Sequence, residues 1–156
     1  QYPVDRLIRQ FKFNQQLHLA RLFGNLLGYK MRDFYANSNY RPDAIIPVPL
    51  HPARLRDRGY NQAFELARFC AQTAGIDLLG KHCIRRKNTQ HQPGLTRSAR
   101  RRNVTGAFEV VGSALPNRVA IIDDVLTTGT TCDALAKTLR KAGAAEIHVW
   151  CVARAL

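Results

Sequence analysis

The most informative part of this sequence is the stretch RVAIIDDVLTTGTT at Arg118–Thr131. It contains Val119–Ile122, a run of aliphatic and β-branched residues without a polar interruption, which is typical of a strand buried in a parallel sheet. Asp123 and Asp124 follow directly, although a buried strand gains nothing from two like charges at its end. The pattern therefore predicts a strand that carries a functional site at its carboxyl end.

A phosphate-binding loop is predicted directly after the two aspartates. Small hydroxyl residues surround one glycine, and a helical pattern follows at Asp133–Lys141. Backbone N–H groups and the helix dipole at such a junction bind anions, and threonine hydroxyls add further donors. Carboxylates just before the loop suit the cis hydroxyls of a ribose, so the order of parts predicts a ribose 5-phosphate site. The predicted cradle consists of Thr127, Thr128, Gly129, Thr130 and Thr131.

A helix cap is the alternative interpretation of the same loop. In that case Thr130 or Thr131 is the N-cap, and Asp133 supports the first turn of the helix. This alternative explains the threonines, but it leaves the paired aspartates at the strand end without a reason.

Hydrophobic periodicity along the rest of the chain predicts alternating helices and strands. We expect one or two helices over 4–35, a helix over 61–74 with Asn61 as its N-cap, and a helix over 131–142. Strands are expected at 44–48, 81–86, 108–111, 119–123 and 147–153. Such interleaving is typical of an α/β fold with a parallel sheet, in which ligands lie beyond the carboxyl ends of the strands. The segments after 48 and after 122 both lie at such ends.

Two stretches resemble one known group of proteins. Arg118–Thr131 is similar to the phosphoribosyl-pyrophosphate (PRPP) signature of the type I phosphoribosyltransferases, and IIPVPLHPARLRDRGYNQA at Ile45–Ala63 resembles the ComF/GntX family. The resemblance extends from about Phe11 to the end of the chain. It implies a type I phosphoribosyltransferase fold, with a mostly parallel central sheet flanked by helices and an N-terminal helical segment. The expected division is a helical segment at 1–40, packed on the core, and a phosphoribosyltransferase domain at 41–156.

The resemblance also implies a chemistry. Type I phosphoribosyltransferases transfer a phosphoribosyl group from PRPP to a nitrogen base or amine and release pyrophosphate. Asp123 and Asp124 are then expected to bind the ribose hydroxyls, and the cradle the 5-phosphate, with Mg²⁺ carried by PRPP and water and no direct metal ligand from the protein. The best-known ComF proteins serve DNA uptake in natural transformation. We expect either such a transferase or a non-catalytic PRPP- or nucleotide-binding accessory factor that binds single-stranded DNA in competence.

A pyrophosphate site is predicted in the segment 47–61. Arg54, Arg56 and Arg58 stand at every second position, and Gly59 follows them. Pyrophosphate with bound magnesium needs cations and backbone donors at close range, and glycine permits a close backbone approach. We therefore predict Arg54, Arg58 and Gly59 as pyrophosphate-binding residues. The alternative is a solvated basic turn between a strand and a helix.

The segment 86–105 is predicted to be a mobile basic loop. No acid occurs between Asp77 and Glu109, while eight cations do. Type I transferases carry a flexible loop that closes over PRPP, and the resemblance implies that Lys87, Arg86 or Arg97 stabilises the departing pyrophosphate. The cluster Arg100, Arg101 and Arg102 is expected to do the same or to bind the backbone of a nucleic acid. A surface basic run on a short helix is the alternative.

Charge and length narrow the class of protein further. With 24 Lys and Arg against 11 Asp and Glu, the 156-residue chain has a net charge of +13, which favours polyanionic partners. No apolar run approaches the ~18 residues that cross a bilayer, so we expect a soluble, cytoplasmic protein without membrane insertion. Its partners are expected to be PRPP, single-stranded DNA and competence proteins such as a helicase. The chain opens on Gln1, from which we expect a piece of a longer protein.

The four cysteines are not expected to form a metal site. Cys70, Cys83, Cys132 and Cys151 are widely separated and contain no C-x-x-C pair. We expect them to be small buried hydrophobic residues. Many members of the family carry a four-cysteine zinc ribbon ahead of this domain, and this sequence contains none.

Overall fold

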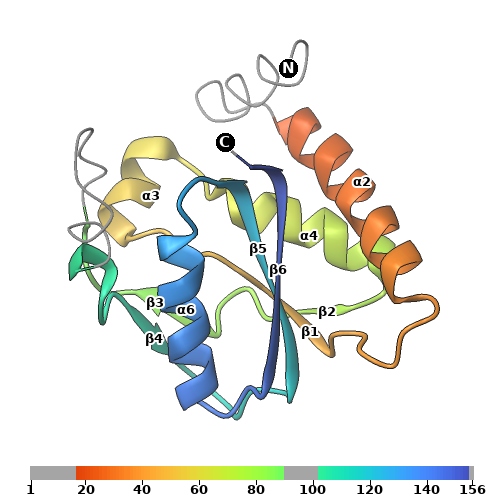
Figure 1. Cartoon of the computed structure of the whole chain (residues 1–156). Coiled ribbons are helices and arrows are strands. Elements are labelled where there is room, and N and C mark those ends of the chain that lie inside the picture. The colour runs from red at the N-terminus through yellow and green to blue at the C-terminus, as the bar shows by residue number, and fades with distance from the viewer. Residues whose placement is uncertain (1–16, 90–101, 155–156) are drawn as a thin grey trace.

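A four-stranded parallel sheet forms the centre of the molecule (Figure 1). The computed structural model describes residues 17–89 and 102–154. Its strands lie in the order β2 (Asp77–Leu78), β1 (Ala44–Pro47), β5 (Arg118–Leu126) and β6 (Glu146–Arg154), and every pairing in this sheet is parallel. A parallel sheet needs helical crossovers, and these cover both of its faces. The expected fold class is confirmed.

Each face of the sheet has its own hydrophobic core. Helices α2 (Leu17–Tyr35) and α4 (Gln62–Ala74) lie on one face, and α6 (Thr130–Lys141) lies on the other. Because successive strand residues point to opposite faces, Ala120 and Ile122 enter the α2–α4 core, while Val119 and Ile121 enter the α6 core. The uninterrupted apolar run that predicted a doubly buried strand is explained by this arrangement.

The predicted N-cap of α4 is present. The Asn61 side chain accepts hydrogen bonds from the N–H groups of Ala63 (3.0 Å) and Phe64 (3.4 Å). At the other end Gly75 adopts φ 65°, and its N–H donates to the carbonyl of Ala71. Asn61 and Gly75 thus satisfy backbone groups at the two ends of the helix.

Two elements differ from the sequence-based expectation. Strands β3 (Cys83–Arg85) and β4 (Phe108–Val110) form as predicted, but they pair antiparallel with each other in a separate two-stranded sheet. The segment expected as a loop contains a short helix, α3 (Pro52–Arg58). Its signals were in the sequence, since Pro52 suits a first helical position, His51 Nδ1 accepts from Ala53 N (3.2 Å), and Gly59 ends the helix with φ 79°.

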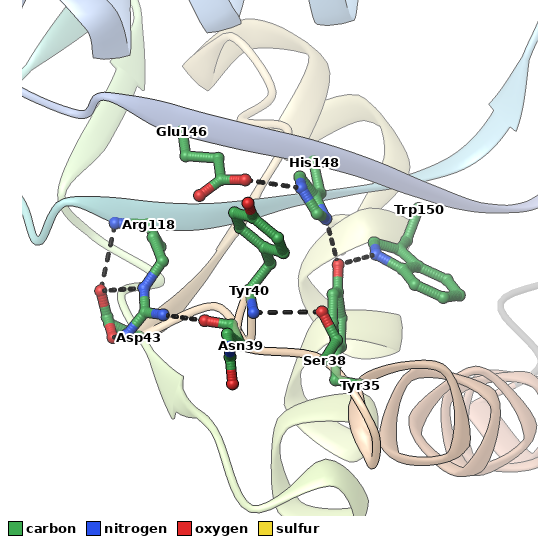
Figure 2. A network of polar contacts seen from close by, with 9 residues as sticks. All are labelled: Tyr35, Ser38, Asn39, Tyr40, Asp43, Arg118, Glu146, His148 and Trp150. Carbon is green, nitrogen blue, oxygen red and sulfur yellow. Dashed lines mark hydrogen bonds and ion pairs between the residues drawn. The ribbon is translucent and has the colours of Figure 1, made fainter.

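A polar network fastens the end of α2 to the amino-terminal ends of β5 and β6 (Figure 2). Trp150 Nε1 donates to the hydroxyl oxygen of Tyr35 (3.0 Å), and this hydroxyl also contacts His148 Nδ1. Close by, Arg118 pairs with Asp43 (Nη2 to Oδ1, 3.0 Å), whose pKa is lowered chiefly by that hydrogen bond. The network lies at the end of the sheet away from the predicted site, so it serves the fold.

Among the described residues, no helix combines the length and the apolar character that crossing a bilayer requires.

Two glycines of α2 allow it to pack closely on α4. A Cβ atom added at Gly24 would lie 2.7 Å from Phe69 Cβ, and one added at Gly28 would lie 2.7 Å from Thr73 Cβ. Backbone carbonyls of α4 stand 2.8 Å from both positions, so the helices would have to separate.

We predict that Gly24→Ala and Gly28→Ala each lower the free energy of unfolding by roughly 1–3 kcal/mol, because overpacking outweighs the better helix propensity of alanine. Urea denaturation measures the change. The control is Gln72→Ala at an exposed position of α4, expected to change stability by about 0.5 kcal/mol or less. Stabilisation by either glycine substitution would show that the helices are not tightly packed here.

Candidate functional site

A cleft of about 150 Å³ opens at the carboxyl ends of β1 and β5. It brings together nearly all the residues predicted for ribose, phosphate and pyrophosphate. Its walls come from the segment after β1, from the end of β5 with the loop that follows, and from β3. The lining residues with functional side chains or backbone are Arg54, Arg58, Arg85, Asp123, Asp124, Thr127, Thr128, Gly129, Thr130 and Thr131.

Each of the two aspartates accepts a hydrogen bond from a nearby donor. Asp123 accepts the N–H of Asp124 at Oδ1 (2.9 Å), and the Cys132 thiol points at its Oδ2 (3.6 Å). Asp124 accepts the N–H of Val125 (2.7 Å). Burial, and secondly the charge of Asp124, raise the pKa of Asp123 to about 7. β5 continues to Leu126, so both carboxylates project from regular strand rather than from a loop.

The predicted phosphate loop is a turn onto α6. Gly129 is the N-cap, with φ 75°, and the cap has no side-chain hydrogen bond. The alternative in which Thr130 or Thr131 caps the helix is therefore not what the structure contains. The N–H groups of the first helical turn have no carbonyl partner within a helix, and an anion satisfies them well. The hydroxyls of Thr128 and Thr130 lie 2.8 Å apart, at the same end of the cleft.

Helix α3 determines which arginines reach the cleft. The three arginines stand at every second position in the sequence, but the helical period places Arg54 and Arg58 one turn apart on the same face. Burial, and secondly the charge of Arg58, lower the pKa of the Arg54 guanidinium. Gly59 does not line the cleft. It ends α3 instead, and its N–H donates to the Leu55 carbonyl (2.8 Å).

The sequence-based reasoning missed Arg85, which lines the cleft from β3. Arg85 belongs to the acid-free basic run between Asp77 and Glu109, and the composition of that run does not distinguish a buried cation from exposed ones. A local signal existed, because strand alternation places position 85 on the same face as Cys83, and both are buried.

Within the part of the predicted basic loop that the structure describes, Arg86, Lys87 and Arg102 do not line the cleft. Arg86 is exposed and paired with Glu109 (Nη2 to Oε1, 3.0 Å), and Lys87 Nζ donates to the Thr105 carbonyl (2.7 Å). Arg102 is exposed. Arg97, Arg100 and Arg101 lie outside the described residues. The catalytic and nucleic-acid roles of these residues remain predictions.

Known proteins similar to this chain were sought by sequence. No protein-family model matches it. Competence protein F of Haemophilus influenzae is 41% identical over 157 residues, covering 98% of this chain and 69% of that protein. The DNA utilization protein YhgH of Escherichia coli K12 is 31% identical, covering 99% of this chain and 68% of that protein.

The chain belongs to the competence protein F family.

Solved structures agree with this membership at the level of the fold. A glutamine PRPP amidotransferase from B. subtilis superposes with a TM-score of 0.59 at 20% identity, covering 93% of this chain and 30% of that one. A purine phosphoribosyltransferase from Pyrococcus horikoshii gives a TM-score of 0.53 at 22% identity, covering 85% and 73%. This member of the competence protein F family therefore has the type I phosphoribosyltransferase fold.

The raised pKa of Asp123 implies that the stability of the protein depends on pH. Because the folded state holds this proton more tightly than the unfolded state, the free energy of unfolding falls as pH rises from about 4 to about 7. We expect Asp123→Asn to remove that loss and to stabilise the protein at pH 8 by roughly 2–4 kcal/mol, with little gain at pH 4.

Denaturation curves at pH 4, 6 and 8 measure this dependence. The control is Asp77→Asn, an exposed carboxyl on β2, which should show no comparable gain at pH 8. Equal or lower stability of Asp123→Asn at pH 8 would contradict a raised pKa at this position.

Proposed function

We propose that this protein binds PRPP and transfers its phosphoribosyl group to a nitrogen base or amine, with release of pyrophosphate. One observation carries the proposal. A single cleft brings together paired carboxylates, a hydroxyl- and glycine-rich helix N-terminus and arginines, which are the groups that a phosphorylated ribose with a diphosphate needs.

Each wall of the cleft has a proposed role. Asp123 and Asp124 accept hydrogen bonds from the ribose hydroxyls, and the loop from Thr127 to Thr131 holds the 5-phosphate through N–H and hydroxyl donors. Arg54 and Arg58 bind the diphosphate, for which guanidinium groups offer paired donors. The relatives' printed names say nothing of these residues, so the roles rest on the geometry and on the resemblance to the PRPP signature.

The proposed transfer forms one bond and breaks another at the anomeric carbon of the sugar. The C–O bond to the diphosphate breaks, and pyrophosphate leaves with its electron pair. A nitrogen lone pair of the acceptor forms the new C–N bond, and that nitrogen loses a proton. Negative charge grows on the leaving group, so the arginines stabilise the transition state more than the ground state. Lys87, Arg86 and Arg97 are proposed to add to this when PRPP is bound.

Magnesium is proposed to arrive with PRPP. Within residues 17–89 and 102–154 no group of three or more His, Cys, Asp and Glu side chains could hold a metal ion. The carboxylates that line the cleft are Asp123 and Asp124, which fits an ion bound mainly by diphosphate oxygens and water.

A second candidate function has its own observation in its favour. Arg86, Lys87 and Arg102 are exposed cations in a chain of net charge +13, and relatives are named for DNA utilization and competence. The alternative is an accessory factor in DNA uptake that binds PRPP or a nucleotide without turnover and also binds single-stranded DNA. Such a factor would act in the cytoplasm with competence proteins such as a helicase.

Replacing both aspartates tests the PRPP site. We predict that Asp123→Asn with Asp124→Asn lowers PRPP affinity about 100-fold or more, because each substitution replaces a carboxyl oxygen that accepts from the ribose hydroxyls by an amide nitrogen, and the negative charge of the pair is lost. Calorimetric titration with PRPP and Mg²⁺ measures it, and Asp77→Asn serves as the control. Unchanged affinity in the double variant would refute the assignment.

Turnover is tested separately on the same proteins. Incubation with PRPP, Mg²⁺ and a panel of bases and amines should release pyrophosphate above the control without acceptor, and the double variant should abolish that release. PRPP binding without any such release would favour the accessory factor.

Single-stranded DNA binding is predicted to be electrostatic. Affinity for an oligonucleotide should fall steeply between 50 and 200 mM salt, by roughly tenfold or more, because phosphate contacts release counterions. Replacing Arg100, Arg101 and Arg102 by glutamine should weaken binding and flatten the salt dependence, as fluorescence anisotropy would measure. An affinity indifferent to salt or to these substitutions would exclude this surface.

A further inference from the structure

Arg85 is an unusual residue in this fold. Among the described residues, Gln62 and Arg85 are the polar side chains that are buried, and Arg85 is 9% exposed. Its Nε–H has no hydrogen-bond acceptor among those residues, and none of the ion pairs between them involves Arg85. A buried guanidinium with a donor that lacks an acceptor destabilises a folded protein.

The rest of the side chain is fixed in place. Its Nη2 donates to the hydroxyl of Thr89, and its guanidinium carbon lies 5.5 Å from the ring centroid of Phe108. Phe108 is the register partner of Arg85 in the β3–β4 pair and is itself buried. The guanidinium is therefore positioned in advance, with part of its donor fork occupied and Nε–H left over.

The neighbours of Arg85 identify what is missing. Burial lowers the pKa of its guanidinium, the charge of Arg54 lowers it further, and Asp123 opposes both. Arg85 thus lines the same cleft as Arg54 and Asp123 and is subject to the charges of both. Two arginines close together in a partly dry cleft repel each other, and a multiply charged anion between them relieves the repulsion and supplies the acceptor for Nε–H.

We infer that Arg85 is an anion-binding residue of this cleft, which together with Arg54 selects a sugar carrying a diphosphate beside the ribose hydroxyls over one carrying only the 5-phosphate. The inference rests on the proposed PRPP site and adds to it a specificity-determining residue on β3. Arg85 is fixed by Phe108 and Thr89 before the ligand arrives, so little side-chain entropy is lost on binding.

A structural role and a ligand-binding role predict opposite effects on stability. If Arg85 held the fold together, its removal would destabilise the protein. If Arg85 serves to bind a ligand, Arg85→Gln and the apolar Arg85→Met should leave the free energy of unfolding unchanged or raise it, because each removes a buried charge that has no ion-pair partner among the described residues. The exposed Arg140→Gln on α6 is a matched control for the loss of one positive charge.

Binding is measured by calorimetry with PRPP, inorganic pyrophosphate and ribose 5-phosphate, each with Mg²⁺. Arg85→Gln should weaken PRPP and pyrophosphate binding by about 10- to 100-fold, and change ribose 5-phosphate binding less than about twofold. Arg85→Lys should fall between, since it keeps the charge without the fork. Arg140→Gln should bind all three ligands as the parent chain does.

The outcomes separate this inference from the proposed function. If the parent chain binds PRPP and Arg85→Gln binds it equally well, the inference is overturned and the function stands. If the parent chain binds pyrophosphate in an Arg85-dependent way but not PRPP, the function fails and the anion site of Arg85 stands. Equal losses for all three ligands, or instability of every Arg85 variant, would also overturn the inference.

Discussion

The burial of β5 on both faces is the constraint on which the site depends. Two separate cores require the alternating side chains of Val119–Ile122 to be apolar, and parallel pairing to β1 and β6 fixes the direction of the strand. The first polar residues after this run, Asp123 and Asp124, therefore lie at the carboxyl end of the strand, where they are partly shielded from water. Their proximity and burial raise the pKa of Asp123 to about 7, and a ligand with hydroxyl donors matches such a pair.

The same edge collects positive charge from elements distant in sequence. Helix α3 follows β1 and contributes Arg54 and Arg58, while β3 contributes Arg85 from outside the main sheet. Opposite charges thus line one cleft, with carboxylates from the end of β5 and guanidinium groups from α3 and β3. The proposed ligand offers a counterpart to each, hydroxyl donors for the carboxylates and phosphate oxygens for the guanidinium groups.

Much of the fold followed from local patterns, and the exceptions have physical reasons. The buried strand, the cap of α4 and the α6 helix were predictable because their signals are periodicity and terminal residues, which act locally. Helix α3 is seven residues long, so its apolar periodicity is too short to read, and only its flanking His51, Pro52 and Gly59 mark it. The antiparallel pairing of β3 and β4 depends on contacts between strands, which one strand's sequence does not encode.

In the candidate site, too, the features that local sequence patterns indicate were predicted, and those that depend on distant contacts were not. The predicted carboxylates, cradle and arginines are neighbours in space because each lies in or just after the carboxyl end of a strand of one parallel sheet, and the order of elements in the sequence already indicates this. The order of elements did not identify Arg85, because β3 lies outside the parallel sheet. Its burial depends on Phe108, which is distant in sequence.

Asp123 and Arg85 each place an ionisable group in a partly dry environment, one beside a second carboxylate and the other beside a second guanidinium. Both arrangements destabilise the folded state. The ligand of the proposed function, which carries hydroxyls and a diphosphate, would relieve both at once, so part of its binding energy would come from a destabilisation already present in the protein. Such a ligand would be favoured over one that relieves a single end. Transfer needs in addition an acceptor held in line with the anomeric carbon.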